Sequence, residues 1–307
     1  MVGDKLLITG GSGMLGSNLV KSTEDRFNVH AVYYKHPVNF KACQVHQLDI
    51  TKREDTIKLV SNINPDYIIH TAALIDVDYC ETHRDEAWKL NIEGTRNLVD
   101  AAEKIGSRIF YISTDSVFDG KKGMYTEEDK PNPLNFYALT KLRGERVVSK
   151  SHVPYTIIRT NIYGWNVQEK LSIAEWMLSN LQENKKLTLF SDVFFSPMLA
   201  NNLSEIIIEM VEMNLSGLFH VAGSERCSKL QFGLMLAKVF GLNKELIKPI
   251  SLEDKKLVAK RPKDPSLSSE KVQKQVRTKL LNVKEGLEAF KSLRDTGYVK
   301  ELKRCLL

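Results

Sequence analysis

A glycine-rich segment directly after the first apolar run constrains the fold of this chain more than any other feature. The run Leu6–Ile8 leads into Thr9–Gly16, which reads TGGSGMLG, and a helical pattern follows at once. In a strand–turn–helix unit of this spacing, Gly10 permits the tight turn, Gly13 lets the backbone approach a ligand, and Gly16 lets the helix pack close to the strand. The start of the helix then offers free N–H groups to a pyrophosphate.

The N-terminal half alternates strand patterns with helical ones. Helices are expected over Thr51–Asn62, where Thr51 and Glu54 suggest a capping box, and over Asp85–Ile105 and Ala138–Ser149. Such alternation predicts an α/β fold, a Rossmann-like doubly wound parallel sheet covered by helices on both faces. The expected strands are Lys5–Thr9, Val29–Tyr34, Gln44–Leu48, Tyr67–Thr71, Arg108–Ser113 and Tyr155–Arg159.

The alternation of strand and helix patterns becomes less regular after about residue 160. Short strands are expected near Leu187–Phe190 and Leu218–Ala222, between longer helical patterns. We therefore predict an NAD(P)-binding domain over residues 1–160. Residues 161–307 are expected to form a smaller, mixed α/β substrate-binding lobe with elements that return to the main sheet. The helices of this half are expected over Ile173–Leu181, Leu199–Met213, Ser228–Phe240 and Val283–Leu293.

Composition excludes several classes of protein. The chain has 307 residues, 42% of them hydrophobic, and no apolar run of the length that spans a bilayer. Its four cysteines are scattered without disulfide or zinc spacing, which favours a cytoplasmic location and no metal site. The net charge of +6 comes mostly from lysines that alternate with glutamates, so nucleic-acid binding is not expected.

A second constellation suggests chemistry. Tyr137 and Lys141 lie four residues apart, so that on a helix the phenol and the ammonium share a face. A neighbouring cation favours the phenolate and is expected to lower the tyrosine pKa. Thr114 and Asp115 end the buried strand just upstream, where a parallel sheet presents ligand-facing groups. Together these groups can polarise a carbonyl and protonate its oxygen.

Further motifs extend this pattern along nearly the whole chain. They are Thr9–Gly16, His70–Ala73, Val77-Asp78, Glu81, Asn91, Ser113–Gly120, Tyr125, Glu128, Asp129, Pro133–Asn135, Tyr137–Glu145, Arg261-Pro262 and Leu267. On these motifs the chain resembles the extended short-chain dehydrogenase/reductases, and among them the dTDP-4-dehydrorhamnose reductases.

The resemblance implies a role for each site residue. Thr114 would hydrogen-bond the sugar carbonyl, Tyr137 would donate the proton, and Lys141 would lower the tyrosine pKa and hold the nicotinamide ribose. Asp115 and Arg261 would contact the substrate, Arg261 at its diphosphate. The implied cofactor-binding residues are Gly10, Ser12, Gly13, Met14, Leu15, Gly16, Asp49, Ile50, Thr71, Ala72, Ala73, Asn91, Tyr137 and Lys141.

The end of the second strand favours NADPH over NADH, which remains the alternative. An acidic residue there would accept hydrogen bonds from the ribose of NAD, whereas a cation suits the 2′-phosphate of NADP. The chain reads Tyr33-Tyr34-Lys35-His36 at this point, without a carboxylate. Lys35 is therefore the predicted phosphate contact, although a solvated loop lysine would also fit.

The chain departs from the reductase pattern in the substrate pocket. Ser116 stands where these enzymes often have tyrosine, Ile162 stands where they have a sugar-contacting tryptophan, and Val193–Met198 replaces a glutamine-containing loop. Trp165 is a candidate substitute for the missing tryptophan, with a core position as the alternative. These changes leave the identity of the sugar open.

The predicted function is NADPH-dependent reduction of a nucleotide-diphospho-4-keto-6-deoxy sugar, with dTDP-4-dehydro-L-rhamnose as the leading substrate. One alternative is a nucleotide-sugar 4-epimerase or dehydratase, although a dehydratase typically has glutamate where Ser116 stands. Another is a non-catalytic NADP-binding subunit resembling the regulatory subunit of methionine adenosyltransferase. The resemblance also suggests a homodimer through the helices at 85–105 and 138–149. Asp76, Asp78 and Glu81 are candidates for binding Mg²⁺ at such a contact, with solvent-facing acids as the alternative.

Overall fold

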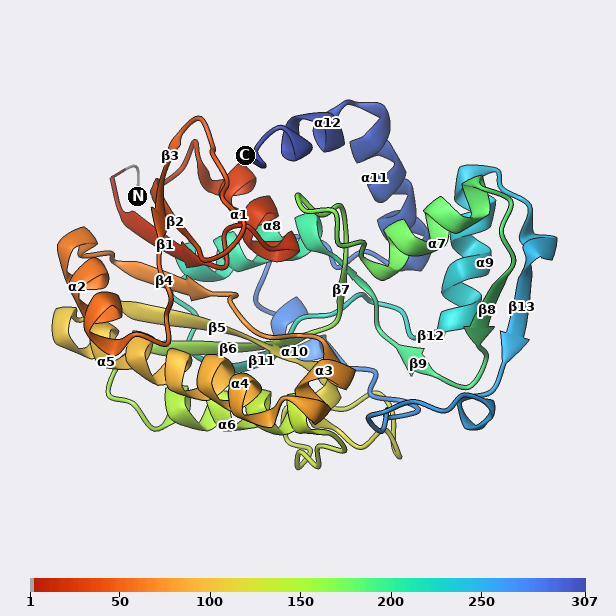
Figure 1. The fold of residues 1–307 in the computed structure, drawn as a ribbon, viewed down its shortest axis with the longest axis horizontal. Coiled ribbons are helices and arrows are strands. Elements are labelled where there is room, and N and C mark those ends of the chain that lie inside the picture. Colours follow the sequence, from red (N-terminus) through yellow and green to blue (C-terminus); the bar gives the residue numbers. More distant parts are fainter. Residues whose placement is uncertain (1–2) are drawn as a thin grey trace.

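A parallel seven-stranded sheet forms the centre of the computed structural model, which describes residues 3–307 (Figure 1). The strand order is β11-β6-β5-β4-β1-β2-β3, so the chain winds outward in both directions from the β1–β4 pair. This reversal creates the point at which doubly wound sheets bind ligands. The strands are β1 (Lys5–Thr9), β2 (Asn28–Tyr33), β3 (Cys43–Gln47), β4 (Tyr67–His70), β5 (Arg108–Thr114), β6 (Tyr155–Thr160) and β11 (Gly217–His220).

Helices cover both faces of the sheet because its central strands are apolar on both sides. Leu6 and Ile8 of β1 face one hydrophobic cluster and Leu7 faces another, as the two-residue period of a strand requires. The first cluster includes α1 (Met14–Thr23) and α8 (Ala200–Glu212). Opposite them lie α2 (Arg53–Ile63), α5 (Thr95–Ile105) and α6 (Phe136–Ser149) (Figure 1).

One predicted helix contains a segment that was not expected, and one predicted cap is wrong. The predicted helix 85–105 is helical throughout, but it consists of α4 (Arg84–Trp88), a π-helical segment at Lys89–Gly94, and α5. The expected capping box of α2 is absent: Lys52 is the N-cap residue, with no side-chain cap, and the hydroxyl of Thr51 bonds to the carboxylate of Asp49. The aspartate two residues earlier thus competes successfully for the threonine.

Most of the remaining elements build the second lobe, seen at the right of Figure 1. Its strands form short pairs, β9 with β12 and β8 with β13, while β7 pairs with β10 between the lobe and the main sheet. The strands are β7 (Ile162–Tyr163), β8 (Leu187–Phe190), β9 (Phe194–Phe195), β10 (Met198–Leu199), β12 (Cys227–Ser228) and β13 (Ile247–Ile250).

The helices of this lobe are α7 (Ile173–Gln182) and α9 (Lys229–Phe240), with α11 (Val283–Asp295) packed against α9. Outside the lobe, α3 (Val77–Thr82) lies beside α6, α10 (Glu270–Gln273) contacts β11, and α12 (Tyr298–Lys303) packs against α11. 3₁₀ turns occur at Asp115–Val117, Lys244–Leu246 and Leu252–Asp254.

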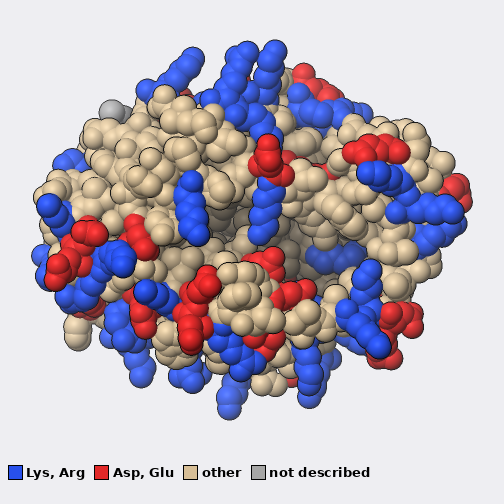
Figure 2. Space-filling view, in the orientation of Figure 1, with Lys and Arg blue, Asp and Glu red and all other residues tan. Residues whose placement is uncertain are grey.

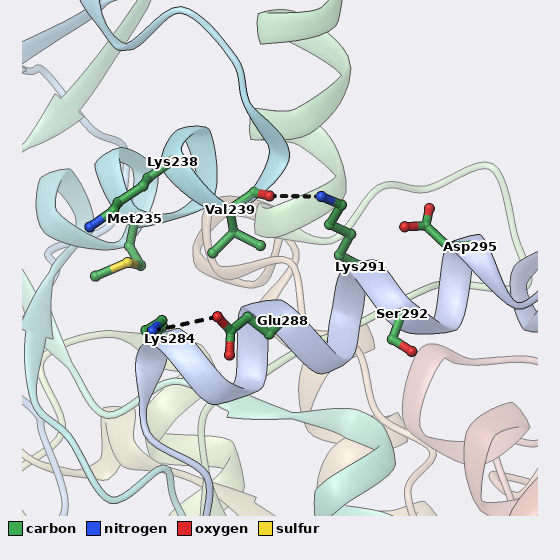
Figure 3. Close-up of a pocket in the computed structure, with 8 residues that line it drawn as sticks. All are labelled: Met235, Lys238, Val239, Lys284, Glu288, Lys291, Ser292 and Asp295. Carbon is green, nitrogen blue, oxygen red and sulfur yellow. Dashed lines mark hydrogen bonds and ion pairs between the residues drawn. The ribbon is translucent and has the colours of Figure 1, made fainter.

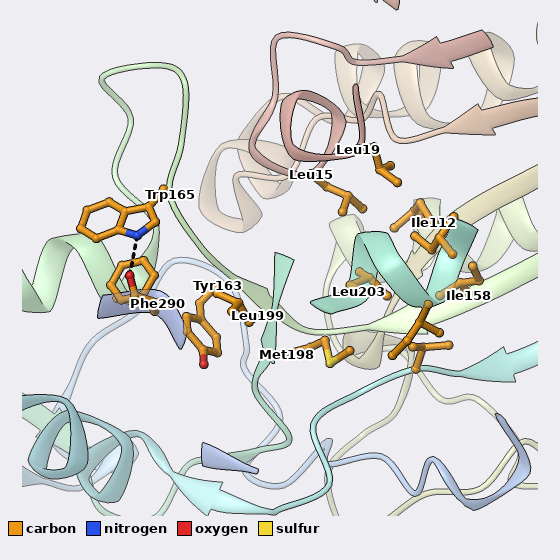
Figure 4. Close-up of a cluster of buried hydrophobic side chains, with 14 of the residues drawn as sticks. Leu15, Leu19, Ile112, Ile158, Tyr163, Trp165, Met198, Leu199, Leu203 and Phe290 are labelled. Atoms are coloured by element: carbon orange, nitrogen blue, oxygen red, sulfur yellow. Dashed lines mark hydrogen bonds between the residues drawn. The ribbon is translucent and has the colours of Figure 1, made fainter. Parts of the chain in front are cut away.

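The two halves of the chain share one core. Strand β11 pairs with β6, and Leu203 of α8 packs in the cluster that contains Leu15 and Leu19 of α1 (Figure 4). Near the C-terminus, Leu306 forms a β-bridge with Val38 beyond β2. Among residues 3–307, no helix is both long and apolar enough to cross a membrane. The domain boundary near residue 160 stays a prediction, since the core crosses it.

Candidate active site

The glycine turn has the backbone shape that a phosphate-binding loop needs. Gly10 has φ 71°, and a Cβ on it would come within 2.7 Å of the Thr71 hydroxyl. A Cβ on Gly16 would overlap the carbonyl of Gly10, so the turn and the helix approach each other as closely as glycine allows. Gly13 is the N-cap of α1 and has no side chain to occupy the first-turn N–H groups. The turn therefore fits a pyrophosphate.

The loop after β4 lies against this turn at the reversal of strand order. The Thr71 hydroxyl donates to the carbonyl of Thr9 at 2.7 Å, and the Thr9 hydroxyl bonds to Nδ1 of His70 at 2.7 Å. His70 also bonds to Thr95 through Nε2, and burial lowers its pKa to about 3, so it is neutral. Ala72 and Ala73 follow as partly exposed residues beside the turn. These hydrogen bonds fix the loop after β4 beside the glycine turn, where the cofactor is predicted to bind.

Asn91 fixes the continuation of the same loop. Its amide exchanges two hydrogen bonds with the backbone of Leu74, at 2.8 and 3.0 Å, and also donates to the hydroxyl of Thr140 at 2.9 Å. The residue lies in the π-helical segment, a feature that often marks functional sites. Asn91 thus links the loop after β4 to helix α6, which carries Tyr137 and Lys141.

The residues predicted to contact the adenosine half of the cofactor lie at the same edge of the sheet. Asp49 accepts from the amide and hydroxyl of Thr51, at 3.0 and 2.7 Å, and remains partly exposed. Ile50 is buried, and its carbonyl accepts from Asn97 at 2.9 Å. Lys35 follows β2 as an exposed side chain. The roles of these residues toward a cofactor stay predictions.

Thr114, Tyr137 and Lys141 come together at the end of β5. The Thr114 hydroxyl accepts from the amide of Ser116 at 3.1 Å, and a hydrogen bond between Thr114 and Tyr137 moderates the pKa of the phenol. Lys141 is 4% exposed, and its ammonium lies 4.2 Å from the centre of the Tyr111 ring. The structure thus brings Thr114 of β5 to the helix that carries Tyr137 and Lys141.

Burial dominates the ionisation of the pair. It raises the pKa of Tyr137 well above the usual value, in spite of the bond from Thr114, and it lowers the pKa of Lys141 to about 7. The expectation that Lys141 lowers the pKa of Tyr137 is therefore not met in the chain by itself, because loss of solvation dominates the pKa of each group. A neutral phenol is the form that can donate a proton.

Asp115 is a buried carboxylate directly after Thr114. It is 1% exposed, and it accepts from Thr114 at 3.1 Å, from Ser116 at 3.2 Å and from Asn161 at 2.6 Å. Burial raises its pKa, and the hydrogen bond from Asn161 and the charge of Lys229 partly oppose this shift. All three hydrogen-bond partners are neutral. The cation whose charge acts on Asp115 is Lys229.

A buried ion pair anchors the helix that carries the trio. Glu145 and Arg159 are nearly inaccessible to solvent and lie 2.7 Å apart, and the Ser113 hydroxyl donates to Glu145 at 2.6 Å. Arg159 also lies over the ring of Phe118. Sheet strands β5 and β6 are thereby tied to α6 directly below Lys141.

Arg261 is occupied by protein groups. Its guanidinium pairs with Asp78 at 3.0 Å and donates to the carbonyl of Ala259 at 2.9 Å. The neighbouring acids are engaged as well: Asp76 caps α3, and Glu81 accepts from the amide of Phe136 at 2.9 Å and pairs with Arg84. No cluster of three metal-binding side chains occurs among residues 3–307.

Trp165 lies in the core. Its indole stacks on Phe290 at 4.1 Å and donates to the Phe290 carbonyl at 2.8 Å (Figure 4). The core alternative therefore holds, and Trp165 does not replace a sugar-contacting tryptophan, because its indole N–H and one ring face are used within the core. Ile162 begins β7 beside Asn161, and Ser116 turns its hydroxyl to Asp115.

Sequence reasoning missed two residues near the site. Asn161 comes directly after β6, and its place at the carboxyl edge of a strand was an available signal. Phe195 lies in the Val193–Met198 loop that was expected at the substrate pocket, but Lys229 reaches it only because β9 pairs with β12, and no spacing in the sequence indicates that contact. The surface is hollowed between the two lobes, with lysine and acidic side chains around the opening (Figure 2).

A family model described as the RmlD substrate binding domain matches residues 4–294. The chain belongs to this family. It is 30% identical over 273 residues to a probable low-salt glycan biosynthesis reductase, Agl14, of Haloferax volcanii, covering 87% of this chain and 90% of the relative. The beta subunit of methionine adenosyltransferase 2 of Rattus norvegicus is 29% identical, over 88% of this chain and 81% of that protein.

A solved structure supports the same assignment. The dTDP-4-dehydrorhamnose reductase of Bacillus anthracis in complex with NADP has a TM-score of 0.85 at 28% identity, covering 95% of this chain and 99% of that one. The predicted family, the Rossmann-like fold and the class of NAD(P)-dependent oxidoreductase of this reductase type are thus confirmed. The chain is thus similar both to a protein named as a reductase and to one named as a methionine adenosyltransferase subunit.

Proposed function

We propose that this chain reduces a nucleotide-diphospho-4-keto-6-deoxy sugar with NADPH, and that dTDP-4-dehydro-L-rhamnose is the substrate to test first. The observation that carries the proposal is that Thr114, Tyr137 and Lys141 lie at the end of β5, on the same carboxyl edge of the parallel sheet as the glycine turn. A neutral phenol and a hydroxyl at one point are the groups that carbonyl reduction requires.

The chain's residues act on the carbonyl oxygen. NADPH, when bound, supplies the hydride. Thr114 would hold the carbonyl oxygen, and Tyr137, kept neutral by burial, would donate its proton to that oxygen as charge develops on it. Lys141 would then stabilise the phenolate that remains, because a cation beside a buried anion offsets its lost solvation. Asn91 and the Glu145–Arg159 pair would keep α6 in place during these steps.

The decisive experiment compares Tyr137→Phe with wild type. Removal of the phenolic proton donor is expected to lower kcat/KM by about 100-fold or more. The measurement is NADPH oxidation on addition of the 4-keto sugar nucleotide. Tyr34→Phe is the matched control, since Tyr34 is exposed beyond β2. An unchanged rate in Tyr137→Phe, or no oxidation by a wild-type protein that binds NADPH, would contradict the proposal.

NADPH is proposed as the reductant on the strength of Lys35, which follows β2 where a 2′-phosphate would lie, and of the NADP held by the Bacillus anthracis relative. A parallel assay with NADH tests the preference. A nucleotide-sugar epimerase or dehydratase is the less favoured alternative, because the residue after Asp115 is Ser116, which only supports the Asp115 carboxylate.

A non-catalytic role is the second candidate, and the likeness to methionine adenosyltransferase 2 subunit beta favours it. In that case the protein would bind NADP and a synthetase without turning over a sugar. The two functions are separated by adding 4-keto sugar nucleotide to protein saturated with NADPH: oxidation requires the reductase, and its absence together with co-purification of a synthetase supports the subunit.

We also propose that the chain forms a homodimer through α4, α5 and α6. Trp88 of α4 is 41% exposed at this face. A hollow of about 520 Å³ beside it is lined by Ile92, Arg96 and Arg143, among other residues of the same helices. An exposed tryptophan beside a groove with apolar and arginine side chains is the composition that interfaces favour.

A further inference from the structure

Three cations of the C-terminal half, Arg226, Lys229 and Arg261, differ in their partners. Arg226 pairs with Asp264 at 2.6 Å, and Arg261 pairs with Asp78 at 3.0 Å. Lys229 makes neither an ion pair nor a side-chain hydrogen bond with any residue from 3 to 307. Lys229 is thus a cation whose three N–H donors remain available to a ligand.

The backbone at Lys229 is held rigidly. Lys229 is the first residue of α9, and its amide donates to the carbonyl of Val193 at 2.9 Å. Ser228 and Gln231 form a capping box, with bonds of 2.8 and 3.1 Å between side chain and backbone. The backbone amides of Ser228, Lys229 and Gln231 are therefore already hydrogen-bonded, whereas the Lys229 ammonium can still donate.

The direction of the side chain follows from two contacts. The ammonium lies 3.1 Å from the centre of the Phe195 ring, so this aromatic face supports it from one side. Its charge also acts on Asp115, which adjoins Thr114 and accepts from that residue's hydroxyl. Lys229 therefore lies on the C-terminal lobe with its ammonium against Phe195 and within electrostatic range of Asp115.

Lys229 remains mostly charged at neutral pH. Burial lowers its pKa to about 8, and the charge of Asp115 opposes that shift. Asp115 itself is buried, with a raised pKa, and its close partners are neutral groups. A lysine held in this way favours a ligand that brings negative charge, since a partly buried ammonium has lost solvation that no carboxylate contact replaces.

We propose that Lys229 binds the diphosphate of the nucleotide-sugar substrate. This inference rests on the proposed function. It also moves the predicted diphosphate contact away from Arg261, whose guanidinium is already paired with Asp78. A lysine ammonium is a compact point charge suited to phosphate oxygens, and Phe195 restricts the positions that it can adopt.

The experiment compares Lys229→Met, Lys229→Arg and a control, Lys238→Met. Methionine keeps the apolar stem against Phe195 and removes only the charge. Lys238 lies on the same helix but is exposed, on the groove between α9 and α11 (Figure 3). Calorimetric titrations with dTDP, UDP, GDP and thymidine measure binding without any need for turnover.

The expected result is a loss of about 10- to 100-fold in nucleoside-diphosphate affinity in Lys229→Met, which corresponds to one charge-assisted hydrogen bond. Lys229→Arg should retain most of the affinity, Lys238→Met should match wild type, and thymidine and NADPH binding should not change. Equal dTDP, UDP and GDP affinities in wild type and Lys229→Met, or a wild type that binds none of them, would overturn the inference. If instead the affinity loss is found without any NADPH oxidation, the proposed reaction fails and the diphosphate site stands.

Discussion

At the scale of single residues, the site depends on Lys141, a buried lysine that forms no ion pair with a carboxylate of residues 3–307. Lys141 is 4% exposed and rests against the ring of Tyr111, while Glu145 attracts it without forming an ion pair. Burial lowers its pKa from 10.5 to about 7. The protein therefore gives up stability at low pH in order to keep an ammonium beside Tyr137.

This loss of stability gives a pH-dependent prediction. Between about pH 7 and pH 10 the unfolded chain carries a proton on Lys141 that the folded chain has lost, so the unfolding free energy rises with pH, by up to about 1.4 kcal/mol per unit. Lys141→Met lacks this dependence. In denaturant titrations the stability of wild type relative to Lys141→Met should increase over that range. Lys238→Met should run parallel to wild type, and a flat or falling difference for Lys141→Met would refute the expectation.

At the scale of secondary-structure elements, a buried ion pair and the side-chain amide of Asn91 fix the position of helix α6. The Glu145–Arg159 pair joins it to β6, and Asn91 joins it to the loop after β4. The catalytic face of α6 is thereby fixed between two strands that are distant in sequence. Helix propensity alone would not set its position so exactly.

Breaking the buried ion pair should therefore be costly. Arg159→Met leaves the Glu145 carboxylate buried with the Ser113 hydroxyl as its remaining partner, and the unfolding free energy is expected to fall by about 3–5 kcal/mol. The matched control is Lys284→Met, which breaks the exposed pair with Glu288 and should cost less than about 0.5 kcal/mol. Thermal or chemical denaturation measures both variants; equal effects would show that Arg159 is not an anchor.

The same elements explain what sequence reasoning could and could not reach. Strand β1 begins and ends as predicted at Lys5 and Thr9, because a strand buried on both faces reads as one apolar run. The π-helical turn around Asn91 could not be predicted, since it depends on bonds to Leu74 and Thr140. Lys229 was missed for the same reason, because strand pairing far along the chain brings it to the cleft.

At the scale of the whole molecule, the proposed dimer makes a separate prediction. Trp88→Glu places a charge on the exposed face of α4, where it would be buried at the centre of a two-fold interface. Light scattering after gel filtration should give a dimer for wild type and a monomer for this variant. Trp176→Glu, an equally exposed tryptophan on α7, is the control and should stay dimeric. A monomeric wild type, or a dimeric Trp88→Glu, would count against this face.

The pairing of β11 with β6 has a consequence for synthesis. The sheet gains its seventh strand from residues 217–220, and α8, at 200–212, packs in the same cluster as α1. A nascent chain that has left the ribosome only as far as residue 160 carries an open sheet edge and an uncovered apolar helix. The cofactor domain must therefore wait for more than fifty further residues to emerge before it can close, and chaperones have that interval in which to act.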